Sequence, residues 1–131
     1  MSNLTDLKIH ALFQQLGNSL SSFKVALSTD KKEDKIEEFE SNFVLFCDLL
    51  KLIIESKGQE VILQKDIIQE AFDWRLIDQK EIWLNMLRDH NQIFYIGNKE
   101  SSHDIYINIK EYYLLMQKTF HTLHLKFTAK T

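Results

Sequence analysis

The chain has 131 residues, 44% hydrophobic and 27% charged, which is enough for one globular domain with a hydrophobic core. It has no proline and only three glycines, which argues against an all-β fold with many tight turns and favours long helices. Its net charge of −3 gives it no general attraction for nucleic acid, so a nucleic-acid partner is not expected.

Cysteine content and hydropathy indicate the compartment. Cys47 is the only cysteine, so no internal disulfide can form, which fits a reducing compartment. No apolar run approaches the roughly 20 residues that cross a bilayer. The N-terminal sequence MSNLTDLKIH lacks the charged-then-apolar pattern of a signal peptide. We therefore predict a cytoplasmic protein without membrane contact.

Apolar residues spaced by three and four predict five helices. The expected ranges are 4–28, from the polar stretch 28–30 to about 57, about 65–75, about 79–94 and about 102–123. The third helix is much shorter than the others. The predicted fold is all-α, an antiparallel four-helix up-and-down bundle with an additional short helix, formed by a single domain over residues 1–131.

The first two helices carry the clearest apolar stripes. Their predicted inward residues are Leu4, Leu7, Ile9, Leu12, Phe13, Leu16, Leu20, Phe23 and Leu27, followed by Ile36, Phe39, Phe43, Phe46, Cys47, Leu50, Ile53 and Ile54. Gly17 interrupts the first stripe at a cost of about 1 kcal/mol relative to alanine. We interpret it as a close approach of a neighbouring helix, with a small kink as the alternative.

The run DKKEDKIEEFE predicts a solvated first turn of the second helix, with a partner-docking patch as the alternative.

Turn and cap signals separate the later helices. Gly58 can end the second helix, and the apolar residues 61–63 are read as a staple leading into the third helix rather than a strand. Asp78 and Glu81 form a capping-box pattern before the fourth helix. Gly97 and Asn98 break the pattern, and Ser101 or Ser102 can cap the last helix. The terminal residues 124–131 are expected to fray.

The later helices have inward stripes of their own. Their predicted inward residues are Ile67, Ile68, Ala71 and Phe72, then Ile82, Trp83, Met86 and Leu87, and finally Ile105, Ile109, Tyr112, Tyr113, Met116, Phe120 and Leu123.

His121 and His124 share one face, but a zinc site requires three or four ligands with supporting residues. Without a third ligand or an H-E-x-x-H pattern, we predict no metal site.

The segment QEAFDWRLIDQKEIWLNMLRDHN, residues 69–91, resembles the nucleotidyltransferase substrate-binding protein family, whose members read close to EAFKxGLIxDGExWLDMLKDRN. The matching residues are Glu70, Ala71, Phe72, Leu76, Ile77, Trp83, Leu84, Met86, Leu87, Asp89 and Asn91. Ile105 and Tyr106 match the EIY that opens the family's last helix. Ile36, Phe39, Glu40 and Leu45 fit the family's IQRFEFTYELAWK loosely, so the resemblance covers roughly residues 33–113.

The resemblance implies a fold, partners and a site. Members of this family are small helical proteins of the HEPN superfamily, usually dimeric, and they commonly pair with a small nucleotidyltransferase encoded beside them. It therefore implies a homodimer, a nucleotidyltransferase partner, and a nucleotide or small-molecule substrate. Two basic positions of the family pattern are acidic here, Glu38 and Asp48, so any anionic ligand that those positions hold in relatives would bind more weakly.

The resemblance also locates a degenerate motif. HEPN ribonucleases carry an arginine and, four to six residues later, a histidine, which this family writes approximately as RNxxSHxY. Here His90 takes the arginine position, Tyr95 the histidine position and Gly97 the final tyrosine position. Arg88 cannot substitute for the arginine, because residues 93–95 are isoleucine, phenylalanine and tyrosine.

These replacements remove the chemistry of the motif. An imidazole cannot hold phosphate in the two-pronged manner of a guanidinium, and a phenol, with a pKa of about 10, is a poor base at neutral pH. We predict no catalytic residue and no cofactor. Arg88, His90, Asn91 and Tyr95 are the candidate ligand-binding residues; alternatively, Arg88, Asn91 and the neighbouring Asp89 only hydrogen-bond around the loop.

The predicted function is a non-catalytic substrate-binding or partner subunit of a separate small nucleotidyltransferase. One alternative is a HEPN-type ribonuclease toxin of a toxin–antitoxin pair, against which the missing arginine and histidine argue. The other is a plain helical interaction protein.

Overall fold

We describe a computed structural model, which gives the backbone of residues 4–96 and 99–128 and the side chains of residues 4–93 and 105–127. The helices are α1 (Leu4–Leu27), α2 (Lys32–Ser56), α3 (Gln64–Asp73), α4 (Lys80–Ile96) and α5 (Lys99–Thr128). No strand occurs in the described ranges. The all-α prediction is confirmed.

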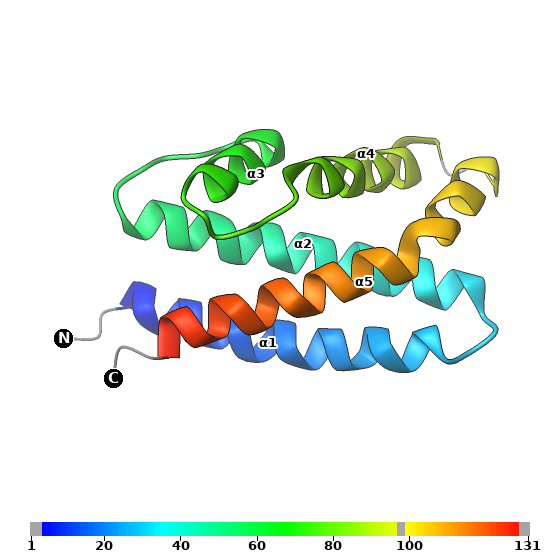
Figure 1. Cartoon of the computed structure of the whole chain (residues 1–131), viewed down its shortest axis with the longest axis horizontal. Helices are drawn as coiled ribbons and strands as arrows, with labels where there is room; N and C mark the ends of the chain where they lie inside the picture. The colour runs from blue at the N-terminus through cyan, green and yellow to red at the C-terminus, as the bar shows by residue number, and fades with distance from the viewer. Residues whose placement is uncertain (1–3, 97–98, 129–131) are drawn as a thin grey trace.

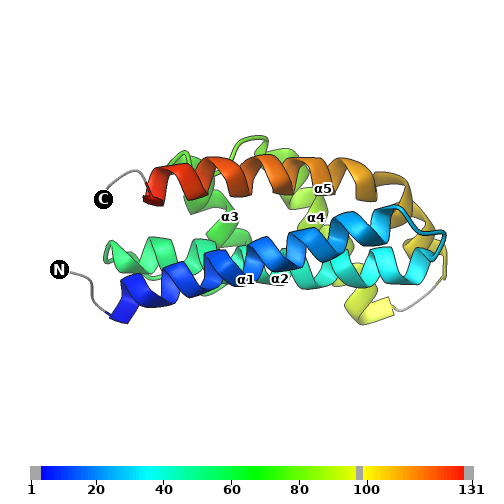
Figure 2. The ribbon, with the colours of Figure 1, turned by 90° about the horizontal axis from the view of Figure 1, so that it is seen from below.

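The four long helices α1, α2, α4 and α5 alternate in direction, as the sequence predicts (Figure 1). α1 and α2 run antiparallel, α3 and α4 return along α2, and α5 closes the bundle beside α1. Turning the molecule by 90° shows the long α1, α2 and α5 extending along the same axis (Figure 2). No helix formed by the described residues combines the length and apolarity needed to cross a membrane.

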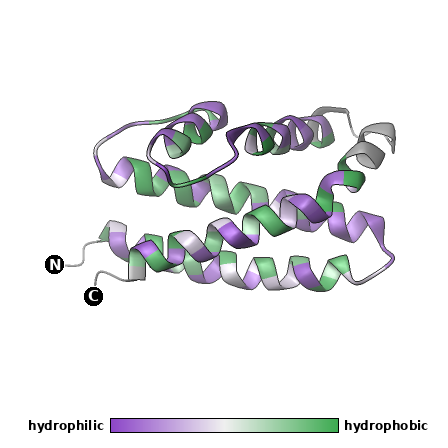
Figure 3. Ribbon diagram, in the orientation of Figure 1, coloured by the Kyte–Doolittle hydropathy of each residue, from purple (hydrophilic) through white to green (hydrophobic). Residues whose placement is uncertain are grey.

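Large apolar side chains fill the centre of the bundle. Trp83 of α4 is fully buried and meets Phe46 of α2 edge to face, with ring centroids 5.2 Å apart. Phe23 of α1 meets Tyr113 of α5 at the same centroid distance. Hydrophobic and hydrophilic residues alternate around the helices (Figure 3). The predicted stripe of α2 is inside along its length, including the buried Cys47, whose thiol pKa burial raises to about 12.

Gly17 marks a close approach of two helices, as predicted. A Cβ atom at Gly17 would lie 3.2 Å from Cζ of Phe120, which belongs to α5. That distance is shorter than ordinary van der Waals contact, so a side chain at residue 17 would press on the Phe120 ring, and its absence lets α5 pack closely on α1 here.

The ends of the bundle differ from the prediction. Leu4 and Leu7 were expected inside but are 67% and 60% exposed. Phe127, near the end of α5, packs on Phe13, with ring centroids 5.9 Å apart, so the first turn of α1 lies beyond the part that α5 covers. Phe72 was also expected inside and is 39% exposed, because α3 is short and its end lies at the surface.

The predicted limits of α5 were too narrow. It begins at Lys99, so Ser101 and Ser102 lie within its first turn rather than capping it. It continues to Thr128 and does not fray after 123, because Phe127 packs on α1 and Lys126 Nζ donates a hydrogen bond to the carbonyl of Arg75 at 2.9 Å. The predicted break at 97–98 lies outside the described residues.

The capping box predicted for α4 is not formed. Gln79 has a φ of 55°, in the left-handed region, and its carbonyl accepts the amides of Ile82 and Trp83. The Asp78 side chain makes no hydrogen bond to α4 within the described part of the chain. Because Gln79 turns the backbone, it takes the N-cap position itself and leaves Asp78 outside the helix. α4 also runs two residues further than expected, to Ile96.

α3 ends on a left-handed arginine. Arg75 has a φ of 61°, its amide donates to the carbonyl of Phe72, and the amide of Leu76 donates to the carbonyl of Ala71 at 2.8 Å. This pattern is a Schellman motif, in which the left-handed residue is usually glycine. The family pattern EAFKxGLI has its glycine at this position.

We therefore expect Arg75→Gly to raise the free energy of unfolding by about 1 kcal/mol, since it removes the steric cost of a Cβ in the left-handed region. Arg75→Ala is the matched control, because it removes the guanidinium and keeps the Cβ. Urea unfolding followed by circular dichroism measures both variants. An equal gain from the two substitutions would contradict a backbone origin.

Candidate functional site

Residues 88–90 lie where α4 packs between α2 and α5, and their side chains leave the helix in different directions. The ring of His90 lies against Phe43 of α2, with centroids 5.2 Å apart, and its Nδ1 is 3.0 Å from Oε2 of Glu40. The two side chains are only 13% and 23% exposed. The contact has the distance of an ion pair but makes no hydrogen bond, and Nδ1 and Glu40 Oε1 are buried without a hydrogen-bond partner in the described structure.

Asp89 faces α5 and is almost fully buried. The hydroxyl of Tyr112 donates a hydrogen bond to Asp89 Oδ2 at 2.5 Å, and the ring of Phe39 from α2 stacks on Tyr112 at 5.3 Å. Burial, and then the bond to the carboxylate, raise the pKa of Tyr112 well above its ordinary value. Arg88 lies 3.5 Å from the other oxygen of Asp89, with 58% of its side chain exposed. The Asp89 carboxylate thus contacts both the exposed guanidinium of Arg88 and the buried hydroxyl of Tyr112 on α5.

The four predicted ligand-binding residues do not assemble into one cluster in the described part of the chain. Arg88 belongs to the Asp89 pair, whereas His90 contacts α2. Asn91 is exposed and makes no side-chain hydrogen bond there. Tyr95 lies in α4, but its side chain is outside the described residues. A ligand-binding role for these residues stays a prediction.

The residues that organise this region were partly missed. Tyr112 was predicted only as a core residue, and its spacing carries no sign that its hydroxyl meets Asp89, 23 residues earlier. Glu40 and Asp89 had a signal, since both fall on matching positions of the family patterns. Each of these acids matches the family pattern on a different helix. Each could therefore have been expected to contact a side chain of a neighbouring helix.

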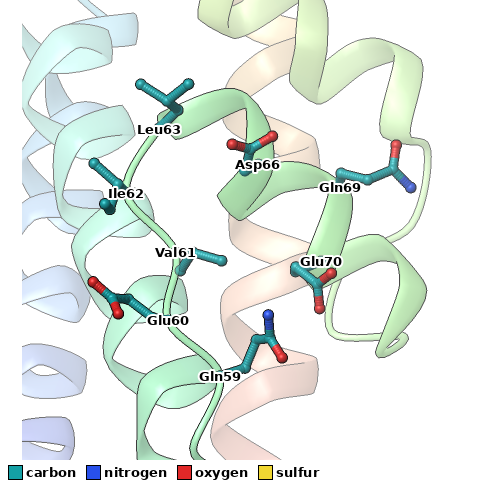
Figure 4. Close-up of a pocket in the computed structure, with 8 residues that line it drawn as sticks. All are labelled: Gln59, Glu60, Val61, Ile62, Leu63, Asp66, Gln69 and Glu70. Atoms are coloured by element: carbon teal, nitrogen blue, oxygen red, sulfur yellow. The ribbon is translucent and has the colours of Figure 1, made fainter.

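A separate hollow lies between the extended stretch after α2 and α3 (Figure 4). Its volume is about 620 Å³, and its lining residues are Gln59, Glu60, Val61, Ile62, Leu63, Asp66, Gln69 and Glu70. The stretch 61–63 is extended but pairs with no strand in the described chain, which agrees with the predicted lead into α3. Among the described residues, no three histidine, cysteine, aspartate or glutamate side chains gather closely enough to hold a metal ion.

Fold and site together define a helical bundle protein in which Asp89 of α4 is hydrogen-bonded to Tyr112 of α5 and His90 of α4 lies against Glu40 of α2. The chain belongs to the family described as nucleotidyltransferase substrate binding protein like, whose model matches residues 8–125. A crystal structure of a protein from Thermus thermophilus is similar, with a TM-score of 0.73 and 21% identity over 82% of this chain and 98% of that chain. At this identity the likeness concerns the fold alone. No curated protein matches the chain.

Proposed function

We propose that this chain is the non-catalytic subunit of a two-protein system, and that it binds a substrate, or presents itself, to a separate small nucleotidyltransferase. Family membership carries the proposal, because the match runs from residue 8 to residue 125 and so includes all five helices. The protein acts in the cytoplasm as a single domain and as a homodimer.

The side chains at the degenerate motif support a role without catalysis. A general base must come within hydrogen-bond reach of the proton that it removes. His90 is instead covered by α2, with Glu40 at its Nδ1, and Asp89 already accepts the Tyr112 hydroxyl. The guanidinium and imidazole that a HEPN ribonuclease requires are replaced at positions 90 and 95.

Exposed apolar side chains supply surface for protein partners. They are Leu4, Leu7, Val25, Val44, Ile62, Leu63, Phe72, Ile107, Leu114 and Leu125. They occur on four of the five helices and on the stretch before α3, so a homodimer and a nucleotidyltransferase can use different faces.

Co-purification with the nucleotidyltransferase encoded beside this chain tests the proposal. We expect a stable complex in size-exclusion chromatography with light scattering, containing both proteins, and a dimer when this chain is alone at tens of micromolar. A tagged unrelated helical bundle is the control. Separate elution of the two proteins at these concentrations would contradict the proposal and favour the plain interaction protein.

A further inference from the structure

Two lysines at the start of α2 converge on one tyrosine of α5. Lys35 is only 8% exposed, and its Nζ lies 3.3 Å from the hydroxyl of Tyr106 and 5.1 Å from the centroid of its ring. Lys32, one turn earlier, has its Nζ 5.4 Å from the same centroid. In the described part of the chain, no carboxylate lies within ion-pair distance of either ammonium group.

Three of the acids nearby in the sequence face elsewhere. Asp34, Glu37 and Glu38 line a different hollow of about 410 Å³, together with residues from the end of α1. Burial, and then the negative charges of Glu37 and Asp34, raise the pKa of Glu38. This direction is expected when acids lie close to one another, because a nearby lysine would lower the pKa of a carboxyl group. In the first turns of α2, these three acids therefore lie toward α1, and Lys32 and Lys35 lie toward α5.

An uncompensated buried ammonium is costly. Charged groups inside proteins are normally paired, because losing their hydration without a counter-ion is strongly unfavourable. The phenol oxygen of Tyr106 and its ring offset only part of that cost for Lys35. The second positive charge of Lys32 adds repulsion. A bound anion would remove both penalties.

We propose that Lys32, Lys35 and Tyr106 form a binding site for a phosphate group. Two ammonium groups match the two negative charges of a phosphate, to which lysine binds as a point charge, and the tyrosine hydroxyl can hydrogen-bond one of its oxygens. The biological meaning rests on the proposed function: the substrate is phosphate-bearing, either a nucleotide or a free polyphosphate.

The site continues into the region around Asp89. Phe39 follows Lys35 by one turn of α2, and its ring stacks on Tyr112, the hydrogen-bond partner of Asp89. The proposed phosphate site is therefore connected through Phe39 and Tyr112 to Asp89 of α4, which is the neighbour of His90 in the sequence. Glu38 and Asp48 occupy the two positions that are basic in the family pattern and acidic here. Neither residue belongs to the proposed phosphate site, so the proposal does not require those positions to be basic.

Isothermal titration calorimetry on the isolated chain tests the site, with pyrophosphate, ATP and adenosine as titrants. We expect binding of pyrophosphate and ATP, no binding of adenosine, and weakening as salt is raised. Tighter binding of ATP than of pyrophosphate would identify a nucleotide site, and equal affinities would identify a site for phosphate alone; either result keeps the proposal. Absence of heat with both phosphate compounds would overturn it.

Variants assign the binding to these residues. Lys35→Met keeps most of the side-chain volume and is expected to weaken pyrophosphate binding by about tenfold or more, while Tyr106→Phe, which removes one hydroxyl, weakens it less. Lys65→Gln on α3 removes the same charge from an exposed position and is the matched control. Equal affinities of Lys35→Met and Lys65→Gln would refute the site.

Folding and function remain separable in this test. Lys35→Met should melt at least as high as the parent, because it removes a buried charge that has no counter-ion among the described side chains. If it does not fold, Lys32→Gln at the half-buried neighbour replaces it. The titrations contain no nucleotidyltransferase. Loss of phosphate binding with an intact protein complex would therefore overturn only this site, and phosphate binding without a complex would overturn only the proposed function.

Discussion

Tyr112→Phe should lower the free energy of unfolding by about 1–3 kcal/mol at neutral pH, because it leaves the buried Asp89 carboxylate without its closest hydrogen-bond donor. Arg88 cannot compensate, since it is mostly exposed and 3.5 Å away. Tyr113→Phe is the matched control: Tyr113 is the next residue, is also buried, and makes no side-chain hydrogen bond in the described structure. Urea unfolding followed by circular dichroism gives both values, and equal losses would contradict the assigned role of the Asp89 contact.

The same pair predicts an alkaline effect. The pKa of Tyr112 is raised in the folded protein, so above pH of about 10 the unfolded chain loses the phenol proton while the folded protein keeps it. Stability is thus fully present below that pH and is lost as pH rises further. Tyr112→Phe should flatten the decline more than Tyr113→Phe, whose phenol pKa is raised by burial alone. The Cys47 thiol contributes to the decline equally in both variants. Parallel curves for the two variants would be inconsistent with this account.

Gly17→Leu should cost about 3 kcal/mol, because the side chain would enter the contact of α1 with Phe120 and overpack it. Gly17→Ala should be nearly neutral, since a gain of about 1 kcal/mol in helix propensity offsets a small displacement of the Phe120 ring.

Ser21→Leu, an exposed position one turn further along α1, is the control for adding the same side chain to this helix. Thermal unfolding by circular dichroism compares the three variants. A loss from Gly17→Leu no larger than that from Ser21→Leu would show that α5 can move away from α1 without cost.

The bundle could be predicted because its signals are local. The stripe of α2 repeats along the whole helix and is inside along the whole helix. Gly17, inside the apolar stripe of α1, predicted that a neighbouring helix comes close at this position. It did not predict that the contact would be Phe120 of α5. Periodicity worked here because one face of each helix is covered along most of its length.

The helix ends could not be predicted, since distant contacts and backbone conformations decide them. The end of α5 depends on Phe127 meeting Phe13, which lies near the other end of the chain. The starts and stops around α3 and α4 depend on left-handed Arg75 and Gln79, and neither residue type signals that conformation.

A ligand-binding role for the candidate residues stays a prediction, and the contacts around them could not be predicted from the sequence. The family pattern led to residues 88–91, but spacing along α4 could not show that Asp89 meets α5 while His90 meets α2. Lys35 was hidden in a run of charges that looks uniformly solvated. Only the packing of α2 against α5 separates the buried lysine from the acids beside it.

Intact-mass spectrometry after incubation with a cognate small nucleotidyltransferase and ATP tests the central claim most directly. The resemblance to HEPN toxin pairs implies that the partner can attach nucleotide to the tyrosine two residues after the motif histidine, and that position is Gly97 here. A non-catalytic partner subunit should bind the enzyme and keep an unchanged mass in the segment 88–98. A gain of one or more nucleotidyl groups mapped to Tyr95 would contradict the account and identify a regulated toxin.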